Sequence, residues 1–455
     1  MYIVDDAYLK SEHSRAFRRQ LLVVLTVSLG TFLTGSSIGW MSPALHCLQS
    51  NDSHIKITSE EGSWLALYPE FGHFCAPLLT GYFTDMIGRK TVFITGSIFT
   101  LVGWFLKFLA GSLTTLYAAR IMLGISFGIT MTVSHIYVAE VVSKRIRGTF
   151  SSLLFVTLNL GIVFEFIIGS YLSFKTSALI TTIISVFYVI SLFFIVESPY
   201  YYVAKNKEVE ARKAMIWFKG SFNEETIAEF NSMKKQITGQ SLKFSQSSFK
   251  SFMICMLLSF LSDTTGRPAV ITYAMQNFSN DSLMSPTGFT ILLGSLNALL
   301  PLIPTLLTDK VGRKVIIIIS AIVGGVMHFC TGTLYFLHDT KGLTISGYGW
   351  LLFSTITIYL CSCSIFVTNV LTLRGELISE SSRGMTSGLV SMMYALAIIL
   401  TIKTFQVVRD NLGQHFAFWV LSGSSLVFVL FTSFFLPETK GKTLDEIQKQ
   451  LGRSN

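Results

Sequence analysis

Apolar stretches of about twenty residues recur along this chain from residue 20 to residue 436, and no other feature restricts its fold as strongly. A helix needs roughly 20 mostly apolar residues to cross the hydrocarbon core of a bilayer. Only 13% of the residues are charged, whereas an ordinary soluble domain carries about 25%. The pattern predicts an all-α membrane protein that crosses the bilayer many times, and it argues against a water-soluble enzyme.

Hydropathy in windows of about 19 residues predicts twelve spans. The first six lie near 20–42, 62–83, 92–111, 113–139, 149–172 and 176–196, and the second six near 250–278, 285–308, 314–336, 347–373, 384–408 and 415–436. We expect a cytoplasmic arm (1–19), a first six-helix bundle (20–196), a cytoplasmic linker with short helices (197–249), a second six-helix bundle (250–436) and a cytoplasmic tail (437–455).

The basic residues predict the orientation of the spans, because Lys and Arg accumulate in loops on the cytoplasmic side. With both termini cytoplasmic, few of the 35 Lys and Arg residues fall in outer segments, namely Lys56, Lys175, Lys341 and Arg409. Three N-x-[ST] sequons, at Asn51, Asn277 and Asn280, also lie on the predicted outer side and are candidate glycosylation sites. The net charge of +9 comes from short segments between spans, so it indicates topology and not nucleic-acid binding.

Three pairs of charged segments show that the chain is duplicated. The sequence TDMIGRKTVFI, which begins at Thr84, recurs as TDKVGRKVIII from Thr308. Arg147 comes seven residues after Glu140, and Arg383 comes seven residues after Glu376. The sixth and twelfth spans end near Glu197 and Glu438. Two parallel six-helix repeats with a binding site between them are the plan of major facilitator transporters.

These segments lie at the predicted cytoplasmic ends of spans, where arginines can form two-point pairs with carboxylates. We expect a charged latch that holds the two halves together while the outer side is open. The predicted cytoplasmic gate comprises Asp85, Arg89, Arg120, Glu140, Arg147, Glu197, Asp309, Arg313, Glu376, Arg383 and Glu438. For any single arginine, a role in topology or helix capping is the alternative.

The chain resembles the sugar porter family of the major facilitator superfamily, and especially its insect facilitated trehalose transporter-like members. The resemblance runs nearly end to end and rests on the segment from Asp85 to Lys90, on Arg120 with Gly124 and Gly128, on Glu197-Ser198-Pro199 and on PETKGKTLDEI from Pro437 to Ile447. It implies twelve helices in two pseudo-symmetric bundles and the carriage of a sugar by rocking of the two halves.

The sequence departs from the family pattern at the positions that the resemblance assigns to sugar binding. Ser262, Asp263 and Pro268 replace two glutamines and an asparagine of the seventh span, and Phe155 replaces a glutamine of the fifth. In the eleventh span Tyr394 and Ala395 replace Asn-Trp, whereas Asn297 matches the pattern. The candidate substrate-binding residues are Asn297, Asp263, Ser262, Tyr273, Phe155 and Tyr394, with Tyr273 in an outer gate.

Ionisable residues inside spans are costly and usually functional. Asp263 and Arg267 lie four residues apart, so on one helix face they can pair, and Asp263 can serve substrate hydroxyls or a coupling proton. Lys107 and His328 are interpreted as peripheral, with Lys107 reaching outward to the interface.

Ser37 occupies the place of the acid that proton-coupled sugar porters carry in the first span, which favours facilitated diffusion. The function predicted is transport of trehalose, a monosaccharide or a polyol across the plasma membrane by a monomer. Proton coupling through Asp263 stays open, as does a non-transporting nutrient sensor, although the duplicated charges favour a working transporter. The sequence contains no nucleophile with its base, metal cluster or phosphate loop, so we expect neither catalysis nor a cofactor.

Overall fold

The computed structural model describes residues 6–50, 55–143, 146–221, 223–238, 246–278, 285–299, 312–341, 345–377 and 383–437. All regular secondary structure in these residues is helical, as the sequence predicts. The first half contains α1 (Asp6–Gly39), α2 (Met41–Leu48), α3 (Ser59–Ile87), α4 (Arg89–Leu109), α5 (Leu113–Val141), α6 (Arg147–Tyr171) and α7 (Phe174–Phe193). Then come α8 (Pro199–Ala204), α9 (Glu208–Lys219) and α10 (Glu224–Thr238). The second half contains α11 (Gln246–Thr264), α12 (Arg267–Thr272), η1 (Ala274–Asn277), α13 (Pro286–Leu299), α15 (Arg313–Lys341), α16 (Ile345–Leu377), α17 (Arg383–Leu412) and α18 (Gln414–Phe435).

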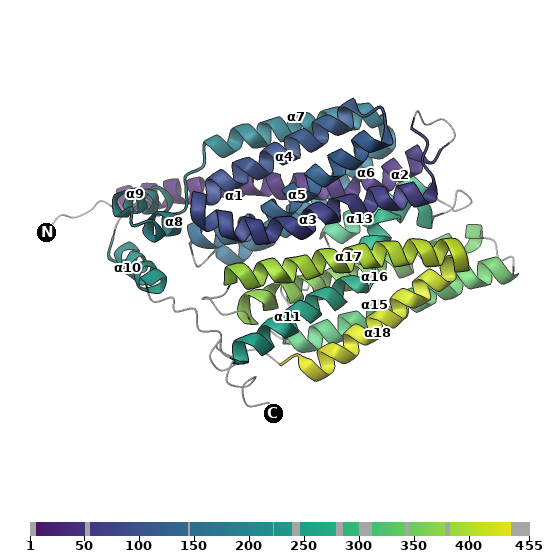
Figure 1. Ribbon diagram of the computed structural model, residues 1–455. Coiled ribbons are helices and arrows are strands. Elements are labelled where there is room, and N and C mark those ends of the chain that lie inside the picture. Colours follow the sequence, from purple (N-terminus) through teal and green to yellow (C-terminus); the bar gives the residue numbers. More distant parts are fainter. Residues whose placement is uncertain are drawn as a thin grey trace.

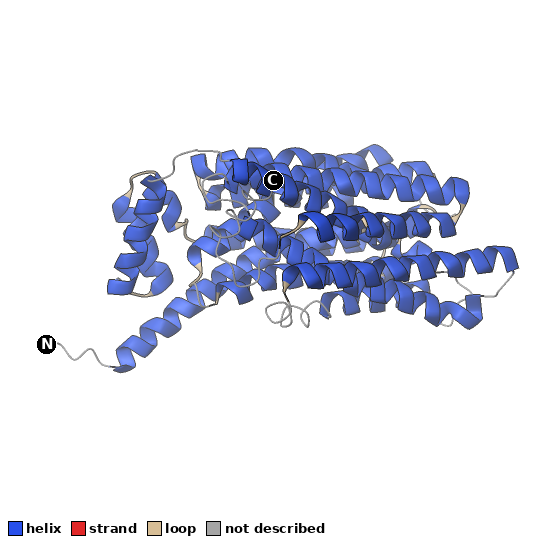
Figure 2. Cartoon of the chain, turned by 90° about the horizontal axis from the view of Figure 1, so that it is seen from below, coloured by secondary structure: helices blue, strands red, loops and turns tan. Residues whose placement is uncertain are grey.

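The long helices form two layers that lie side by side (Figure 1). The layers correspond to the first and second halves, and the long helices run along the length of the molecule in both views (Figure 2). Across the boundary, α3 packs against α17 and α6 packs against α13. Helices α8, α9 and α10 lie at one end, which we call the linker end; the opposite end is the far end.

Nine helices among the described residues are long and apolar enough to cross a membrane. The other three predicted spans coincide with α3, with the series α11, α12 and η1, and with α13, which is described as far as Leu299. Helix α3 carries Glu60, Glu61 and Glu70, and Gly266 separates α11 from α12. The helices thus follow the order of the predicted spans, although the seventh span is interrupted.

A capping box fixes the start of α3 at the far end. The Thr58 side chain accepts a hydrogen bond from the Glu61 backbone N–H, and the Glu61 carboxylate accepts one from the Thr58 backbone N–H at 2.8 Å. Both bonds satisfy donors that a helix N-terminus leaves free. The first turn of α3, with Ser59 and Ser63, is therefore held in a defined position.

Gly266 interrupts the seventh predicted span. Its φ of +118° belongs to the left-handed region that favours glycine, and α11 ends before it while α12 begins after it. A Cβ at this position would also lie 2.5 Å from the Leu421 side chain. The expectation that Asp263 and Arg267 share one helix face is wrong, because the chain turns between them.

A close approach of two helices positions Arg120. A Cβ on Gly124 would lie 1.9 Å from the Pro69 carbonyl oxygen, so only glycine allows α5 to come this close to α3. Small residues at such crossings let membrane helices pack through their backbones. Arg120, one turn before Gly124, is consequently pressed against α3.

Candidate functional site

A cavity lies between the two halves and is lined by side chains from both. Its volume is about 60 Å³. The first half contributes Glu70, Arg120 and Phe127, and the second contributes Arg267, Thr272 and Tyr394. A concave site with apolar walls and a few polar groups is the usual form of a small-molecule site.

Arg120 belongs to this cavity and not to the predicted cytoplasmic gate. Its Nε donates to the Leu65 carbonyl oxygen at 3.0 Å, and its Nη1 donates to the Ser37 carbonyl oxygen at 2.7 Å. The guanidinium also lies 5.4 Å from the Trp40 ring centroid. The gate assignment was wrong because Arg120 lies near the start of α5, whereas Glu140 lies at the end of the same helix.

Arg267 reaches the cavity from the second half. Its side chain is 7% exposed, its Nη2 donates to the Asn159 Oδ1 at 3.5 Å, and its guanidinium lies 6.0 Å from the Phe155 ring centroid. Asn159 and Phe155 belong to α6 of the first half. Arg267 therefore bridges the halves beside the cavity.

Asn297 meets the same asparagine. Its Nδ2 donates to the Asn159 Oδ1 at 3.1 Å, and its Oδ1 accepts a hydrogen bond from Ser364 at 2.7 Å. Asn159 was missed from the sequence, although a polar amide in an apolar span is a signal that could have found it. The predicted residues Asn297 and Phe155 are thus brought together around Asn159 and Arg267.

The other candidate substrate-binding residues are dispersed. Tyr394 lines the cavity and lies edge-on to His73, with 5.8 Å between the ring centroids. Ser262 and Asp263 are buried at the end of α11, where Ser262 donates to the Asp263 carboxylate at 3.3 Å. Tyr273 is 1% exposed and ends α12 towards the far end.

The third charged side chain at the cavity, Glu70, has a partner on its own helix. His73 Nδ1 lies 3.0 Å from the Glu70 carboxylate, and the His73 ring stacks on Phe127 at 4.2 Å. Glu70 thus lines the cavity and is hydrogen-bonded within its own helix.

Five side chains at the linker end form what we call the Arg89 cluster, namely Asp85, Arg89, Glu140, Glu197 and Ser198. Arg89 forms a two-point pair with Glu140, with Nε–Oε2 and Nη2–Oε1 distances of 3.0 and 2.9 Å, and its Nη2 lies 3.2 Å from Asp85. Glu197 accepts from the backbone N–H of Arg89 and of Lys90, both at 3.0 Å, so its carboxylate caps the N-terminus of α4.

All members of the Arg89 cluster belong to the first half or follow it directly. The pairs that the structure describes here therefore lie within one half. The latch between the halves is predicted for the state that is open on the outer side, and it stays a prediction. Arg313 begins α15, and Arg147, Glu376 and Arg383 lie in helices whose side chains at these positions are outside the described part. Asp309 and Glu438 lie outside the described residues altogether.

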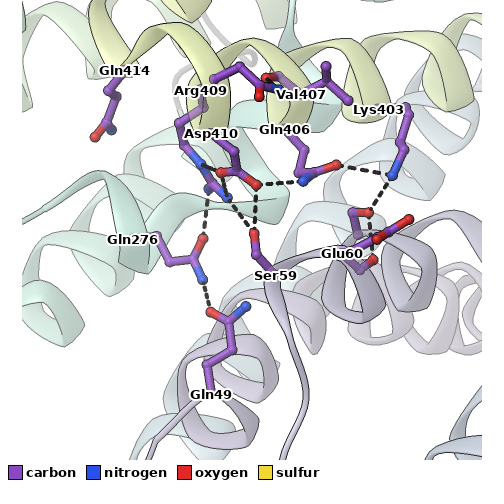
Figure 3. Close-up of polar contacts among 12 residues, drawn as sticks. Gln49, Ser59, Glu60, Gln276, Lys403, Gln406, Val407, Arg409, Asp410 and Gln414 are labelled. Carbon is purple, nitrogen blue, oxygen red and sulfur yellow. Dashed lines mark hydrogen bonds and ion pairs between the residues drawn. The ribbon is translucent and has the colours of Figure 1, made fainter.

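A second set of contacts joins the halves at the far end (Figure 3). We call this set the inter-half network; it comprises Gln49, Ser59, Ser63, Gln276, Lys403, Gln406, Arg409 and Asp410. Ser59 donates to Asp410 at 2.8 Å, Lys403 donates to Ser63 at 3.0 Å, and Gln276 donates to Gln49 at 2.6 Å. Each of these bonds connects α3, or Gln49 directly after α2, to η1 or α17.

Arg409 holds this network together. Its guanidinium donates to Gln276 at 2.9 Å, pairs with Asp410 at 3.0 Å and lies 4.6 Å from the Tyr273 ring centroid. Tyr273 in turn stacks on Phe405. The sequence assigned Arg409 only to topology and left Lys403 as a charge within a span, because no pattern in one chain states which distant residue a side chain will meet.

Two buried groups also contradict the sequence interpretation. Lys107 is 0% exposed, with its Nζ 3.9 Å from the ring centroids of both Trp40 and Trp104, so it does not reach the interface. His328 is likewise 0% exposed, and its ring centroid lies 3.6 Å from that of Tyr359. Both side chains are therefore packed against aromatic rings in the interior of their half.

Asn277 is unsuited to carry a glycan in this fold. It is 3% exposed, and its Oδ1 accepts a hydrogen bond from Gln414 at 3.1 Å. An N-linked glycan needs an exposed amide nitrogen, so this predicted site is wrong. The other two, Asn51 and Asn280, lie outside the described residues.

Known proteins resemble this chain over nearly its whole length. It is 28% identical over 446 residues to the facilitated trehalose transporter Tret1 of Polypedilum vanderplanki, covering 95% of this chain and 88% of that protein. It is also 28% identical over 447 residues to Tret1 of Drosophila mojavensis, of which it spans 52%. The family model for "Sugar (and other) transporter" matches residues 23–451.

Solved structures give the fold. The proton:xylose symporter XylE bound to 6-bromo-6-deoxy-D-glucose superposes with a TM-score of 0.78 at 18% identity, covering 95% of this chain and 99% of that one. An inward-open XylE from E. coli superposes with a TM-score of 0.77 at 19% identity and the same coverage. The chain therefore has the major facilitator fold, and it belongs to the sugar (and other) transporter family of membrane transporters and is not an enzyme.

Proposed function

We propose that this protein is a facilitative transporter that moves a small sugar across the plasma membrane by alternating access, and that trehalose is the first solute to test. The observation that carries this proposal is the cavity that both halves line, with Arg120 on one side and Arg267 on the other. A site shared by two halves can be exposed to one side of the membrane at a time. The Tret1 relatives support trehalose as the starting solute.

The two halves, 20–196 and 250–436, are proposed to move as rigid bodies, with 197–249 as a linker and the linker end facing the cytoplasm. The basic segments beside the spans support this orientation. The far end then faces outward, and the inter-half network is the contact that must break for a solute to enter from outside. Residues 1–19 and 437–455 are proposed to be cytoplasmic.

Uncoupled transport is supported by Ser37, which lines the cavity and accepts hydrogen bonds from Arg120 in place of an acid. A hydroxyl does not gain or lose a proton near neutral pH, so this position offers no coupling proton. We also propose that the protein transports a small solute as a monomer and does not bind nucleic acid.

Uptake of labelled trehalose, glucose, fructose and a polyol by cells that express the chain tests the proposal, with and without a protonophore. Saturable uptake of one of them that the protonophore leaves unchanged supports facilitative transport. Uptake that the protonophore abolishes contradicts the uncoupled mechanism. Absence of uptake despite confirmed surface expression contradicts transport of these solutes.

A further inference from the structure

A chain of hydrogen bonds through Asn159 connects the two halves. Ser364 donates to the Asn297 Oδ1 at 2.7 Å, and the Asn297 Nδ2 donates to the Asn159 Oδ1 at 3.1 Å. The Arg267 Nη2 donates to the same oxygen at 3.5 Å, and the Asn159 Nδ2 donates to the Phe155 carbonyl oxygen at 2.9 Å. Asn159 belongs to α6 of the first half, whereas its donors and Ser364 lie in α12, α13 and α16 of the second.

The chemistry of Arg267 fixes the direction of these hydrogen bonds. A guanidinium can only donate, so the Asn159 atom that faces it is the carbonyl oxygen. This oxygen has two lone pairs, which serve Arg267 and Asn297. One acceptor of the first half therefore satisfies two donors of the second half.

The contact between the halves is buried. Asn159, Asn297 and Ser364 are 1%, 2% and 0% exposed. Gly294 lets α13 approach α6 closely, because a Cβ there would lie 2.9 Å from the Phe166 ring. A buried amide that loses its partner costs free energy, so the Asn297 amide needs an acceptor whenever the halves are closed.

The cavity beside this contact is too small for a sugar in this conformation. Arg267 lines the cavity, whose volume is about 60 Å³, whereas a cavity of roughly 150 Å³ holds one benzene molecule. A sugar therefore enters only when the halves part. Parting breaks the bonds to Asn159 and frees the donors of Arg267 and Asn297, of which Asn297 is a predicted substrate-binding residue.

A transporter without a coupled ion must also pass between its two open states without solute, because each net transport event leaves the site unloaded on the side of release. We infer that Asn159 is a positioning residue that takes the place of the solute in this return step. Its amide oxygen satisfies Asn297 and Arg267, so the halves close with no sugar between them. The inference rests on the proposed transport function and concerns the step that solute binding does not drive.

Two flux measurements in proteoliposomes separate the return step from the loaded step. Zero-trans uptake of labelled trehalose, and in parallel of labelled glucose, requires the unloaded protein to return in each cycle. Equilibrium exchange, with equal sugar on both sides, does not. N159L keeps the size of the side chain but removes the amide, so we expect zero-trans uptake to fall at least fivefold and exchange to change less than twofold. Equal loss in both fluxes, or no loss in either, would overturn the inference.

Two further variants connect the effect to the amide oxygen. N159Q retains an amide on a longer side chain and is expected to recover part of the zero-trans uptake, which a role in packing alone would not give. N369L is the matched control, because Asn369 is 4% exposed and its Nδ2 donates to the Ile365 carbonyl oxygen of its own helix at 2.9 Å. Its Oδ1 has no hydrogen-bond partner within the described part of the chain, so N369L should match the native protein in both fluxes. The same selective loss in N369L would contradict the inference.

A cross-linking measurement decides the inference without transport. If the native chain transports no solute, the proposed function fails, but the double variant S59C/D410C still reports closure at the far end, where Ser59 donates to Asp410 in the same conformation. Without added solute, N159L should slow formation of this disulfide at least threefold, measured as the loss of free thiols relative to the purified chain without the added pair. An unchanged rate would show that Asn159 does not support closure without solute.

Discussion

At the linker end, the Arg89 cluster joins helices of the first half, whereas at the far end the inter-half network joins α2 and α3 to η1 and α17. The Arg89 and Glu140 side chains are 10% and 12% exposed, and those of Arg409 and Asp410 are 17% and 32% exposed. The Arg89 cluster contains a buried two-point ion pair within the first half. The inter-half network is a more exposed set of single hydrogen bonds between the two halves.

This difference teaches how charged residues divide between permanent and reversible contacts. Removing one member of a buried pair leaves an uncompensated charge, which costs roughly 3–5 kcal/mol. A single hydrogen bond in a partly exposed network contributes only about 0.5–1.5 kcal/mol. The Arg89 cluster is therefore suited to keep a half intact, and the inter-half network is suited to break in each transport cycle.

Covalent closure of the inter-half network should have the largest effect. In the S59C/D410C double variant, a disulfide between α3 and α17 replaces the hydrogen bond of 2.8 Å, so flux should fall at least tenfold and return with a reductant. T31C/T157C is the control, because the Thr31 and Thr157 hydroxyl oxygens lie 2.7 Å apart within the first half. Unchanged flux in cross-linked S59C/D410C would mean that the halves do not separate at the far end.

Disruption of the Arg89 cluster should have the next largest effect, and on stability. E140Q removes the carboxylate that pairs with Arg89 at two points, so we expect a loss of roughly 3–5 kcal/mol and a clearly lower melting temperature in detergent. E60Q, which changes an exposed glutamate of α3, should melt like the native protein. A native melting temperature in E140Q would show that the pair contributes little.

A single substitution in the inter-half network should change the conformational equilibrium but not the fold. K403Q removes the charged donor to Ser63 and Gln406, which are bonds of 3.0 and 3.1 Å. Because such bonds contribute about 1 kcal/mol each, the population open at the far end should rise roughly five-fold, and the half-saturation concentration for uptake should fall by a few-fold at most. A melting temperature lowered as far as in E140Q would remove the distinction between the two ends.

The smallest effect is expected in the linker, where an exposed pair joins α9 and α10. Lys234 donates to Glu208, and this hydrogen bond, together with the positive charge of Lys234, lowers the pKa of Glu208. A lowered pKa in the folded state stabilises the fold above the ordinary value of about 4.3, and this contribution is lost as the pH falls through the lowered pKa. The melting difference between native protein and E208Q should thus be small at pH 7 and vanish in acid; a constant difference would contradict the pair.

The same contrast explains how much of the site could be predicted. The repeat around Asp85 and Arg89, together with Glu140 and Glu197, identified the residues that meet at the linker end. The repeat did not show whether these residues join helices of one half or join the two halves, because a duplicated pattern is compatible with both kinds of contact. The inter-half network has no counterpart in any repeat, so Arg409 was assigned to topology alone and Lys403 was left as a charge within a span.

The cavity shows a similar limit. Tyr394, Phe155 and Asn297 were candidates because they occupy positions that the family pattern assigns to sugar binding. Asn159 joins two of these groups through hydrogen bonds to Asn297 and Arg267, and no spacing in the sequence relates it to either. Arg120 was assigned to the cytoplasmic gate because it is charged, although it lies near the start of α5 and the gate residue Glu140 lies at its end.

The sequence by itself determined the helical class, the order of the spans, the duplication and the transporter family, because these depend on local hydropathy and on the residue pattern along the chain. Only the tertiary structure decided that Gly266 separates Asp263 from Arg267, that Lys107 lies between two tryptophans and that the halves meet through Arg409 and Asp410. The sequence shows the charge of a side chain but not its partner. The partner depends on the rotation of each helix and on its distance from neighbouring helices.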